Sequence, residues 1–271
     1  MMERGELKGK VAVVTGGGGI IGSAIAAGLA REGAAVVILN RTQEKSETTA
    51  RRIVDEGGTA LALTLDVLDR AAAERAAAWI RDRLGSVDIL VNGAGGNHPE
   101  ATVSETQSFF DLPTAAIRRV TELNFLGTVI PTQVFGRIMA EQKTGSIINI
   151  ASMASYHPLT NTPAYCAAKS AVANFTEWAA AYFCRNVSER VRVNAIAPGF
   201  LLTEQNRYLL VGSDGEDTPR GRAIKETTPM GRYGRPDEMV GAVLYLCSDA
   251  ASFVTGAVIP VDGGFRAYWG A

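Results

Sequence analysis

The sequence contains little cysteine and histidine and no long block of like charge. Its 271 residues include three cysteines, at positions 166, 184 and 247, and two histidines, with a net charge of −1 at pH 7. Cysteines this few and this far apart form neither a disulfide framework nor a metal-ligand pattern, and they fit a reducing compartment. Two histidines without an acidic cluster give little to build a metal site, so we expect no bound metal. The absence of a basic block argues against nucleic acid as a partner.

Long apolar runs are also missing. No run reaches the ~20 residues that a membrane-spanning helix needs. The first ten residues, MMERGELKGK, lack the apolar core of a signal peptide. We therefore expect a soluble, cytoplasmic protein that does not bind membranes. Hydrophobic residues still make up 46% of the chain, enough for one large or two small α/β domains.

Short apolar, β-branched segments alternate with longer helical segments. The apolar segments are continuous, which is typical of parallel strands covered on both faces. Because no linker or repeat interrupts the pattern, we predict one α/β domain over residues 1–271, a doubly wound parallel sheet of about seven strands with helices on both faces. The predicted strands are Val11–Thr15, Ala35–Asn40, Leu61–Asp66, Ile89–Asn92, Ser146–Ile150, Val191–Ala195 and Val258–Val261. The predicted helices cover residues 22–32, 43–56, 69–84, 114–141, 164–186 and 236–248.

Two features interrupt this pattern. Pro131 lies inside the fourth predicted helix and should kink it or mark a break. The segment from about residue 200 to 235 is long, polar and rich in glycine, proline and charge. Long irregular segments in compact domains are often lids or binding loops, and ligands bind beyond the carboxyl ends of parallel strands. We therefore predict a substrate lid here.

The first predicted strand leads into a glycine-rich turn and then a helix. Such a turn lets the backbone approach a pyrophosphate, whose charge the amino terminus of the helix favours. Four consecutive glycines would be costly in a plain turn, so we predict a dinucleotide-binding loop. Its candidate residues are Gly16, Gly18, Gly19, Ile20, Ile21 and Gly22.

Tyr165 and Lys169, with Ser152 upstream, form a second candidate site. A spacing of four places Tyr165 and Lys169 on one face of a helix. A nearby cation lowers the pKa of a phenol from its ordinary value near ~10, so we expect Lys169 to prepare Tyr165 for proton exchange. Ser152 can hydrogen-bond a carbonyl oxygen at the same place. For this pair taken alone, a solvated helix face is the alternative interpretation.

Together these motifs resemble the short-chain dehydrogenase/reductase family over nearly the whole chain. The glycine loop resembles the family's TGxxxGxG, and VNGAG at residues 91–95 resembles its NNAG. Asn124, Ser152, Tyr165 and Lys169 match the family's catalytic tetrad. The proline–glycine motif that borders the nicotinamide is matched by Pro198, Gly199 and Thr203, and the family's C-terminal strand and turn by residues 261–264.

The resemblance implies a Rossmann-type fold and NAD(P)-dependent hydride transfer to or from a carbonyl carbon. It implies that Tyr165 is the acid and base, and that Lys169 lowers the pKa of Tyr165 and holds the nicotinamide ribose. Ser152 would orient the substrate oxygen, and Asn124 would position a water in a proton relay. The implied cofactor contacts also include Asp66, Val67, Asn92, Gly93, Ala94, Gly95, Pro198, Gly199 and Thr203. Relatives are usually tetramers, so we expect a homotetramer built on residues 114–141, 164–186 and 250–271.

Two positions depart from the family pattern. Ile20 stands where the family usually has the second glycine of its loop, and a β-branched residue there limits the approach of the backbone. The glycines at 17–19 could compensate for it. Gly93 replaces the second asparagine of NNAG, which removes one side-chain hydrogen bond near the adenosine. Neither position belongs to the tetrad, so we expect activity to survive both.

The end of the second predicted strand decides between NAD and NADP. A carboxylate there selects NAD, because it accepts a hydrogen bond from the ribose 2′-hydroxyl, and a nearby arginine accommodates the 2′-phosphate of NADP. Asn40 takes the position of the acid and Arg41 follows, which leans toward NADP(H), with NAD(H) as the alternative. The glycine loop has no basic residue to support that preference, and Arg41 could simply face solvent.

The predicted substrate is a small molecule rich in hydroxyl groups. Polar segments follow the fourth strand, Ser152 and the proline–glycine motif, and they hold both histidines. They suit a sugar acid better than a steroid or an acyl chain, and an arginine pairs well with a carboxylate. The candidate substrate-binding residues are Asn97, His98, Ser152, His157 and Arg207. For each of the loop residues, a role in stabilising the loop is the alternative.

The strings GAGGNHP and NAIAPGF also resemble a narrower branch, the sugar-acid reductases of the D-mannonate oxidoreductase or fructuronate reductase type. In that interpretation the ketone of fructuronate is reduced to the alcohol of mannonate, reversibly. Another reductase, such as a gluconate 5-dehydrogenase or a 3-oxoacyl carrier-protein reductase, stays open. A non-catalytic NAD(P)-sensing protein on the same fold is the remaining alternative, and the complete tetrad argues against it.

Overall fold

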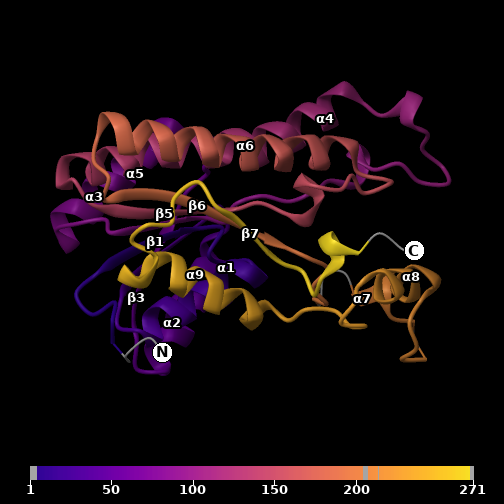
Figure 1. Cartoon of the computed structure of the whole chain (residues 1–271), viewed down its shortest axis with the longest axis horizontal. Coiled ribbons are helices and arrows are strands. Elements are labelled where there is room, and N and C mark those ends of the chain that lie inside the picture. The colour runs from indigo at the N-terminus through magenta and orange to yellow at the C-terminus, as the bar shows by residue number, and fades with distance from the viewer. Residues whose placement is uncertain (1–4, 204–206, 213, 269–271) are drawn as a thin grey trace.

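The protein contains one seven-stranded sheet with helices on both faces (Figure 1). The structure is a computed structural model and describes residues 5–203, 207–212 and 214–268. Glu204, Gln205, Asn206 and Ser213, which belong to the predicted lid, lie outside the described residues. In the sheet, the strands follow the order β3-β2-β1-β4-β5-β6-β7, and every pair is parallel. The predicted Rossmann-type doubly wound fold is confirmed.

The strands and helices follow the predicted alternation. The strands are β1 (Val11–Thr15), β2 (Ala35–Asn40), β3 (Thr59–Thr64), β4 (Ile89–Asn92), β5 (Gly145–Ile150), β6 (Val191–Pro198) and β7 (Val258–Val261). The α-helices are α1 (Ile20–Arg31), α2 (Gln43–Asp55), α3 (Arg70–Leu84), α4 (Thr114–Thr121), α5 (Gly127–Gln142), α6 (Pro163–Asn186), α7 (Arg207–Leu210), α8 (Pro219–Thr227) and α9 (Val240–Cys247). Short 3₁₀ turns include η1 (Pro99–Ala101) and η4 (Met153–Ser155).

Each face of the sheet is covered by its own layer of helices. Alternate residues of the strands point to opposite faces, so Val14 and Ile38 pack beneath α1 and α9, while Val13 and Leu39 pack beneath α3, α5 and α6. Figure 1 shows α1, α2 and α9 on one side and α3, α5 and α6 on the other. Burial on both faces explains why the strands are continuous apolar runs.

Some predicted boundaries are wrong. The third strand covers Thr59–Thr64 instead of Leu61–Asp66, because its register with β2 pairs Ala35 with Thr59 and ends at Thr64. β6 continues beyond Ala195 to Pro198, because β7 pairs with those last residues. Apolar periodicity does not reveal either end, since both depend on the neighbouring strand.

The predicted helix over residues 114–141 is two helices joined by a π-helical stretch at Glu122–Leu126. The break lies there and not at Pro131, which is inside α5. Pro131 is close to the start of α5. The backbone hydrogen bond that it cannot donate is one of the first in that helix, so the helix continues past it. The π-helical stretch carries Asn124, and such stretches often occur at functional sites.

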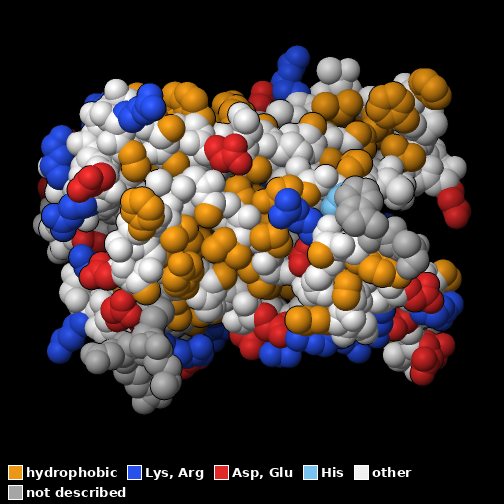
Figure 2. Space-filling view, viewed as in Figure 1, with side chains coloured by type: hydrophobic (Ala, Val, Ile, Leu, Met, Phe, Trp, Pro, Cys, Tyr) orange, Lys and Arg blue, Asp and Glu red, His pale blue; other side chains and the backbone are white. Residues whose placement is uncertain are grey.

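The predicted lid contains two helices, α7 and α8, rather than only irregular chain. Leu210, Ile224 and Tyr233 form a small buried cluster there, against which Phe200 and Leu202 pack. The segment of the predicted lid therefore has its own apolar contacts and lies next to the carboxyl end of β6. Figure 1 shows α7 and α8 at the end of the molecule that also carries the segment before α4, and Figure 2 shows the surface hollowed between them.

Candidate active site

The candidate site lies where the strand order reverses between β1 and β4, at the carboxyl ends of the strands. Ligands of doubly wound sheets bind at this crevice. The two loops that leave β1 and β4 touch there, because a Cβ added at Gly16 would lie 2.6 Å from the carbonyl oxygen of Gly93. A Cβ at Gly93 would lie 2.8 Å from the carbonyl oxygen of Thr15. This close approach explains why glycine stands at position 93.

Thr15 joins these two loops and was missed among the predicted site residues. Its hydroxyl oxygen accepts hydrogen bonds from the amides of Gly93 at 3.1 Å and Ala94 at 3.3 Å. The side chain is fully buried. Its position directly before the glycine loop was the available signal, because a hydroxyl at the end of β1 can reach the neighbouring strand.

The glycine loop delivers the amino terminus of α1 to the crevice. Gly16 has φ of +65°, a conformation that favours glycine, and its carbonyl oxygen accepts from the amide of Gly19 at 2.9 Å. Gly19 is the N-cap of α1, and no side chain caps the helix. Ile20 is the first residue of α1 and Ile21 the second, so Ile20 does not prevent the tight turn. The first N–H groups of α1 can therefore face an anion.

Asn124 ties the π-helical stretch to the loop after β4. Its Nδ2 donates to the carbonyl oxygens of Gly96 at 2.7 Å and Val120 at 2.8 Å, and its Oδ1 accepts from the amide of Gly96 at 3.1 Å. The side chain is fully buried. Both hydrogens of the amide are used, so in this arrangement the side chain can only accept from a water of the kind expected in the relay.

Lys169 lies against the same loop. A Cβ added at Gly95 would lie 2.7 Å from Oδ1 of Asn124 and 3.3 Å from Nζ of Lys169. Nζ donates to the carbonyl oxygen of Ile150 at 2.6 Å. Burial lowers the pKa of Lys169 to about 8. This lysine can therefore be partly neutral near physiological pH.

Tyr165 and Lys169 lie on one face of α6, as the spacing predicts. Nζ of Lys169 is 5.8 Å from the centre of the Tyr165 ring. The expectation that the pKa of Tyr165 is lowered is wrong for the protein alone. Burial raises its pKa, and a hydrogen bond with Ser152 opposes the rise only in part. Burial is the larger effect because the phenolate loses hydration that one hydrogen bond from Ser152 does not replace.

Ser152 is placed by the turn that follows β5. It is the N-cap of η4, and its Oγ accepts from the amide of Ala154 at 3.1 Å. Tyr165 packs on a small buried cluster beside Ala101 and Ala164. The structure thus brings Ser152, Tyr165, Lys169 and the loop that Asn124 holds to one place.

Three residues with predicted cofactor contacts have structural partners. The Nδ2 of Asn92 donates to Thr132 and Asn149 in the core, while its buried Oδ1 has no partner among the described residues. Asp66 follows β3 by two residues, and its carboxylate accepts from the amide of Leu68 at 3.0 Å. Val67 is buried against Gly127 at the start of α5.

The end of β2 carries the amide of Asn40 and the guanidinium of Arg41. Nδ2 of Asn40 donates to the carbonyl oxygen of Thr42 at 3.1 Å, which holds the turn into α2. Arg41 is exposed, and within the described part of the chain it forms no ion pair within 4 Å. The glycine loop itself contains no basic residue, but Lys45 of α2 lies beside it. A Cβ at Gly18 would lie 2.7 Å from Cβ of Lys45 on α2.

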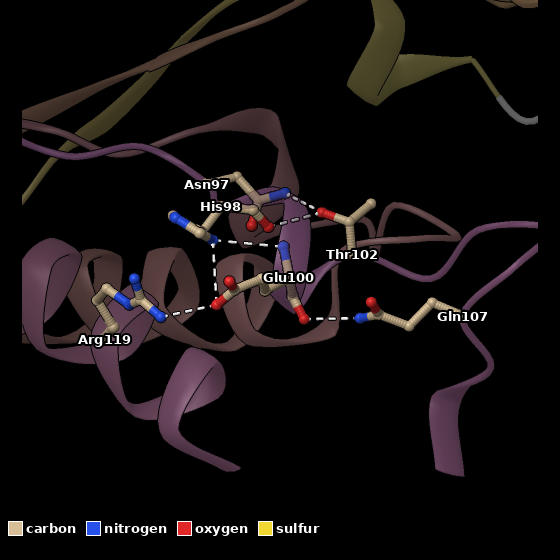
Figure 3. A network of polar contacts seen from close by, with 6 residues as sticks. All are labelled: Asn97, His98, Glu100, Thr102, Gln107 and Arg119. Carbon is tan, nitrogen blue, oxygen red and sulfur yellow. Dashed lines mark hydrogen bonds and ion pairs between the residues drawn. The ribbon is translucent and has the colours of Figure 1, made fainter. Parts of the chain in front are cut away.

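The segment after β4 is a hydrogen-bonded loop (Figure 3). Nδ2 of Asn97 donates to the hydroxyl of Thr102 at 2.8 Å, and this hydroxyl donates to the carbonyl oxygen of His98 at 2.9 Å. The ring of His98 accepts from the amide of Glu100. The side chain of Asn97 therefore helps to hold the loop, which is the alternative that we weighed for it.

The other candidate substrate residues lie on two further segments. His157 Nε2 lies 3.1 Å from the carbonyl oxygen of Arg266, in the turn after β7. Arg207 is exposed and begins α7, so it belongs to the predicted lid, and no described contact joins it to Tyr165. Pro198 ends β6, and Gly199 packs on Asp262, since a Cβ there would lie 2.6 Å from its Cα. Thr203 is partly exposed beyond them.

The arrangement is suited to proton exchange with an oxygen atom beside a bound dinucleotide. A hydroxyl, a phenol and an amine converge at the carboxyl edge of the sheet, next to a helix amino terminus. Within residues 5–203, 207–212 and 214–268, no group of three or more His, Cys, Asp or Glu side chains is placed to hold a metal ion. Among the helices of those residues, none combines the length and the hydrophobicity of a bilayer-spanning segment.

Comparisons with known proteins agree with this chemistry. Residues 18–266 match the family model described as enoyl-(acyl carrier protein) reductase. The chain is 47% identical to the uncharacterized oxidoreductase UxuB of Bacillus subtilis, over 97% of each chain. It resembles a crystal structure from Haemophilus influenza, provisionally assigned as a D-mannonate oxidoreductase with bound NAD, with a TM-score of 0.92, 42% identity and 98% of each chain covered. It also resembles a crystal structure from Beutenbergia cavernae, provisionally assigned as a gluconate 5-dehydrogenase with bound NADP. The TM-score is 0.83 and the identity 37%, and the match covers 98% of this chain and 100% of that chain.

Proposed function

The chain belongs to the short-chain dehydrogenase/reductase family, and from this premise we propose that it interconverts a ketone and a secondary alcohol of a sugar acid. It is an NAD(P)-dependent oxidoreductase. The observation that carries the proposal is the convergence of Ser152, Tyr165 and Lys169 at the crevice between β1 and β4.

The residues at the crevice fit a nicotinamide dinucleotide. The uncapped amino terminus of α1 suits a pyrophosphate, and the glycines at 16 and 93 keep both loops free of side chains there. Asn40 and Arg41 would lie at the adenosine ribose, where the missing carboxylate and the free cation favour NADP(H). When bound, the nicotinamide supplies or accepts the hydride.

The side chains would manage the proton and the substrate oxygen. In the reduction direction, Tyr165 donates its phenolic proton to the developing alkoxide, and Ser152 holds that oxygen by a hydrogen bond. Lys169 supplies positive charge beside the phenol, which favours the phenolate that remains. In the oxidation direction the same groups act in reverse.

Asn124 would act by fixing the loop and not by donating to a water. Its amide hydrogens are bound to Gly96 and Val120. The bonds to Gly96 hold the loop against Nζ of Lys169, and so keep the lysine at its bond to Ile150. A water of a proton relay could still donate to Oδ1, which has one lone pair left.

The polar segments support a sugar acid as the substrate. Asn97, His98 and His157 lie on loops that follow the carboxyl ends of β4 and β5, and Arg207 lies on the lid. A D-fructuronate/D-mannonate pair agrees with the likeness to the Haemophilus influenza protein. A gluconate 5-dehydrogenase is the second candidate, which the likeness to the Beutenbergia cavernae protein favours.

The test is oxidation of NADPH and NADH against keto sugar acids, neutral keto sugars and a 3-oxoacyl thioester. We expect the highest kcat/KM with fructuronate. Reduction of a keto-gluconate instead would select the second candidate. Turnover of the thioester alone would overturn the sugar-acid proposal and leave the family unchanged.

Arg207 is the proposed partner of the substrate carboxylate. Arg207→Ala should raise KM for an acidic substrate about tenfold more than for a neutral keto sugar, because a charge-assisted bidentate contact is lost. Arg220→Ala, an exposed arginine on α8 of the same lid, is the matched control. Equal effects on both substrate classes would overturn this assignment.

We also propose that residues 1–271 act as one domain with residues from about 200 to 235 as the lid, and that the chain assembles as a homotetramer. Trp178 and Tyr182 stack on the exposed side of α6, with ring centres 5.3 Å apart. The four residues of β7 are only partly buried, and Tyr245 on α9 is exposed. Figure 2 shows hydrophobic side chains gathered over α9 and β7. Large apolar patches of this kind are typical of subunit contacts.

A further inference from the structure

Residues on both sides of His98 lie beside the Tyr165–Lys169 pair. Upstream, a Cβ added at Gly95 would lie 3.3 Å from Nζ of Lys169. Downstream, Ala101 belongs to the buried cluster on which Tyr165 packs. His98 therefore lies on a loop whose two ends are next to the reactive pair.

The amide of Glu100 selects one tautomer of His98. It donates to Nδ1 of the ring at 3.3 Å. A ring nitrogen can accept only when it carries no proton, so the neutral ring has its proton on Nε2. No residue of the described part of the chain accepts a hydrogen bond from Nε2, and Figure 3 shows this nitrogen on the side of the ring away from Glu100. A neutral N–H donor is therefore available to a ligand.

The carboxylate of Glu100 lies between two basic groups. Its Oε2 is 2.8 Å from Nη2 of Arg119 on α4 and 3.9 Å from Nδ1 of His98. A free carboxylate at that distance would draw a proton onto Nδ1, which would break the bond from the amide and move the donor to the other side of the ring. Pairing with Arg119 neutralises the carboxylate and so opposes this change.

The ion pair of Glu100 and Arg119 is suited to holding the two side chains in place and adds little to the stability of the fold. Both side chains are more than half exposed, and exposed ion pairs contribute little to folding. The rest of the loop is held independently, because Gln107 donates to the carbonyl oxygen of Glu100 at 2.7 Å and Thr102 to that of His98. Loss of Arg119 should therefore change the state of His98 without unfolding the loop.

We propose that Arg119 is a positioning residue that, by pairing with Glu100, keeps His98 as an Nε2–H donor to an oxygen of the substrate. The substrate part of this inference rests on the proposed function. Because Nε2–H can only donate, the site selects a substrate with a carbonyl, hydroxyl or carboxylate oxygen at this point. Arg119 itself acts through Glu100 and need not touch the substrate.

The tautomer can be measured without knowing the substrate. Nitrogen NMR of the full-length protein labelled with ¹⁵N-histidine, at pH about 8 where an ordinary histidine is neutral, distinguishes protonated from free ring nitrogens. The chain has only two histidines, so His157→Gln identifies the signals of His98. We expect Nε2–H in the wild type and a shift toward Nδ1–H in Arg119→Met. Arg119→Lys should restore the wild-type signals, and Arg118→Met, an exposed neighbour on α4, should not change them.

Kinetics supply the second measurement. With the best substrate of the panel, Arg119→Met should raise KM about threefold to tenfold and leave kcat within about twofold, because only binding is weakened. The affinity for NAD(P)H should not change. A wild-type protein with the proton on Nδ1, or an Arg119→Met variant with the wild-type tautomer, would overturn the proposal. A panel without turnover of sugar acids would overturn the proposed substrate class, and the NMR result would still decide the role of Arg119.

Discussion

Nζ of Lys169 donates to the carbonyl oxygen of Ile150 at 2.6 Å, which places a buried amine beside the turn that carries Ser152. The lysine side chain comes from α6 and the carbonyl from the end of β5. The bond therefore fixes the helix that carries Tyr165 against the strand that leads to Ser152.

The stability of the protein should depend on pH through Lys169. Its pKa is lowered by burial from 10.5 to about 8, so between these values the folded state binds fewer protons than the unfolded state. Stability from this group therefore rises with pH over that window, by about 3 kcal/mol in total, and the charge is destabilising below it. The Lys169→Met variant lacks this pH-dependent contribution to the free energy of unfolding.

Urea unfolding of the wild type and of Lys169→Met, at several values between about pH 7 and pH 10, checks this prediction. The free energy of unfolding of the wild type should increase relative to that of the variant as pH rises. A difference that stays constant over that range would show that Lys169 remains charged in the folded protein.

Gly95→Ala should disturb the site more than the fold. The new Cβ would lie 2.7 Å from Oδ1 of Asn124 and 3.3 Å from Nζ of Lys169, so the loop or both side chains must move. We expect kcat to fall on the order of 10²-fold, since misplacement of about 1 Å can cost that much. Gly241→Ala is the matched control, because a Cβ there meets nothing within 4 Å. Wild-type kcat in Gly95→Ala would mean that Lys169 tolerates displacement.

The fold and the site could be predicted from the sequence to different extents. The continuous apolar strands predict a buried parallel sheet, because periodicity reports burial directly. The spacing of four between Tyr165 and Lys169 predicts their shared helix face, because the period of a helix is a local property. In contrast, the π-helical stretch carries Asn124, whose side chain bonds to Gly96, a residue distant in sequence. Local pattern carries no signal for it.

The electrostatics of the site were the least predictable part. The sequence places a lysine near a tyrosine, which suggests a lowered phenol pKa. The structure shows that burial dominates for both groups, and burial depends on packing by α4 and the loop after β4. Thr15 was overlooked because its role needs the distance between β1 and β4, which spacing along the chain does not give.

Tyr165→Phe should remove the proton donor and leave the dinucleotide site intact. We expect kcat to fall about 10³-fold, within the range for loss of a general acid. The dissociation constant for NADPH, measured by fluorescence titration, should change less than about twofold. Tyr182→Phe, on the exposed side of the same helix, serves as the control. Turnover of Tyr165→Phe at the wild-type rate would exclude Tyr165 as the acid.

Arg41→Ala should weaken NADPH selectively. The guanidinium is exposed at the end of β2 without an ion-pair partner in the described part of the chain, so it is free for a 2′-phosphate. We expect KM for NADPH to rise about tenfold and KM for NADH to stay within about twofold. Asn40→Asp should shift preference the same way by repelling the phosphate. Arg51→Ala on α2 is the control, and an equal loss with both cofactors would place Arg41 away from the phosphate.

Trp178→Glu should dissociate the proposed tetramer. The exposed fractions of Trp178 and Tyr182 are 60% and 46%, and their rings stack in the isolated chain. Apolar aromatic surface of this size is favourably buried between subunits, whereas a carboxylate there would have to lose its water without a partner. Light scattering after size-exclusion chromatography should give a smaller assembly for Trp178→Glu and an unchanged mass for Val54→Glu, a change at an exposed apolar residue of α2. A wild-type mass for Trp178→Glu would mean that this face of α6 stays in solvent.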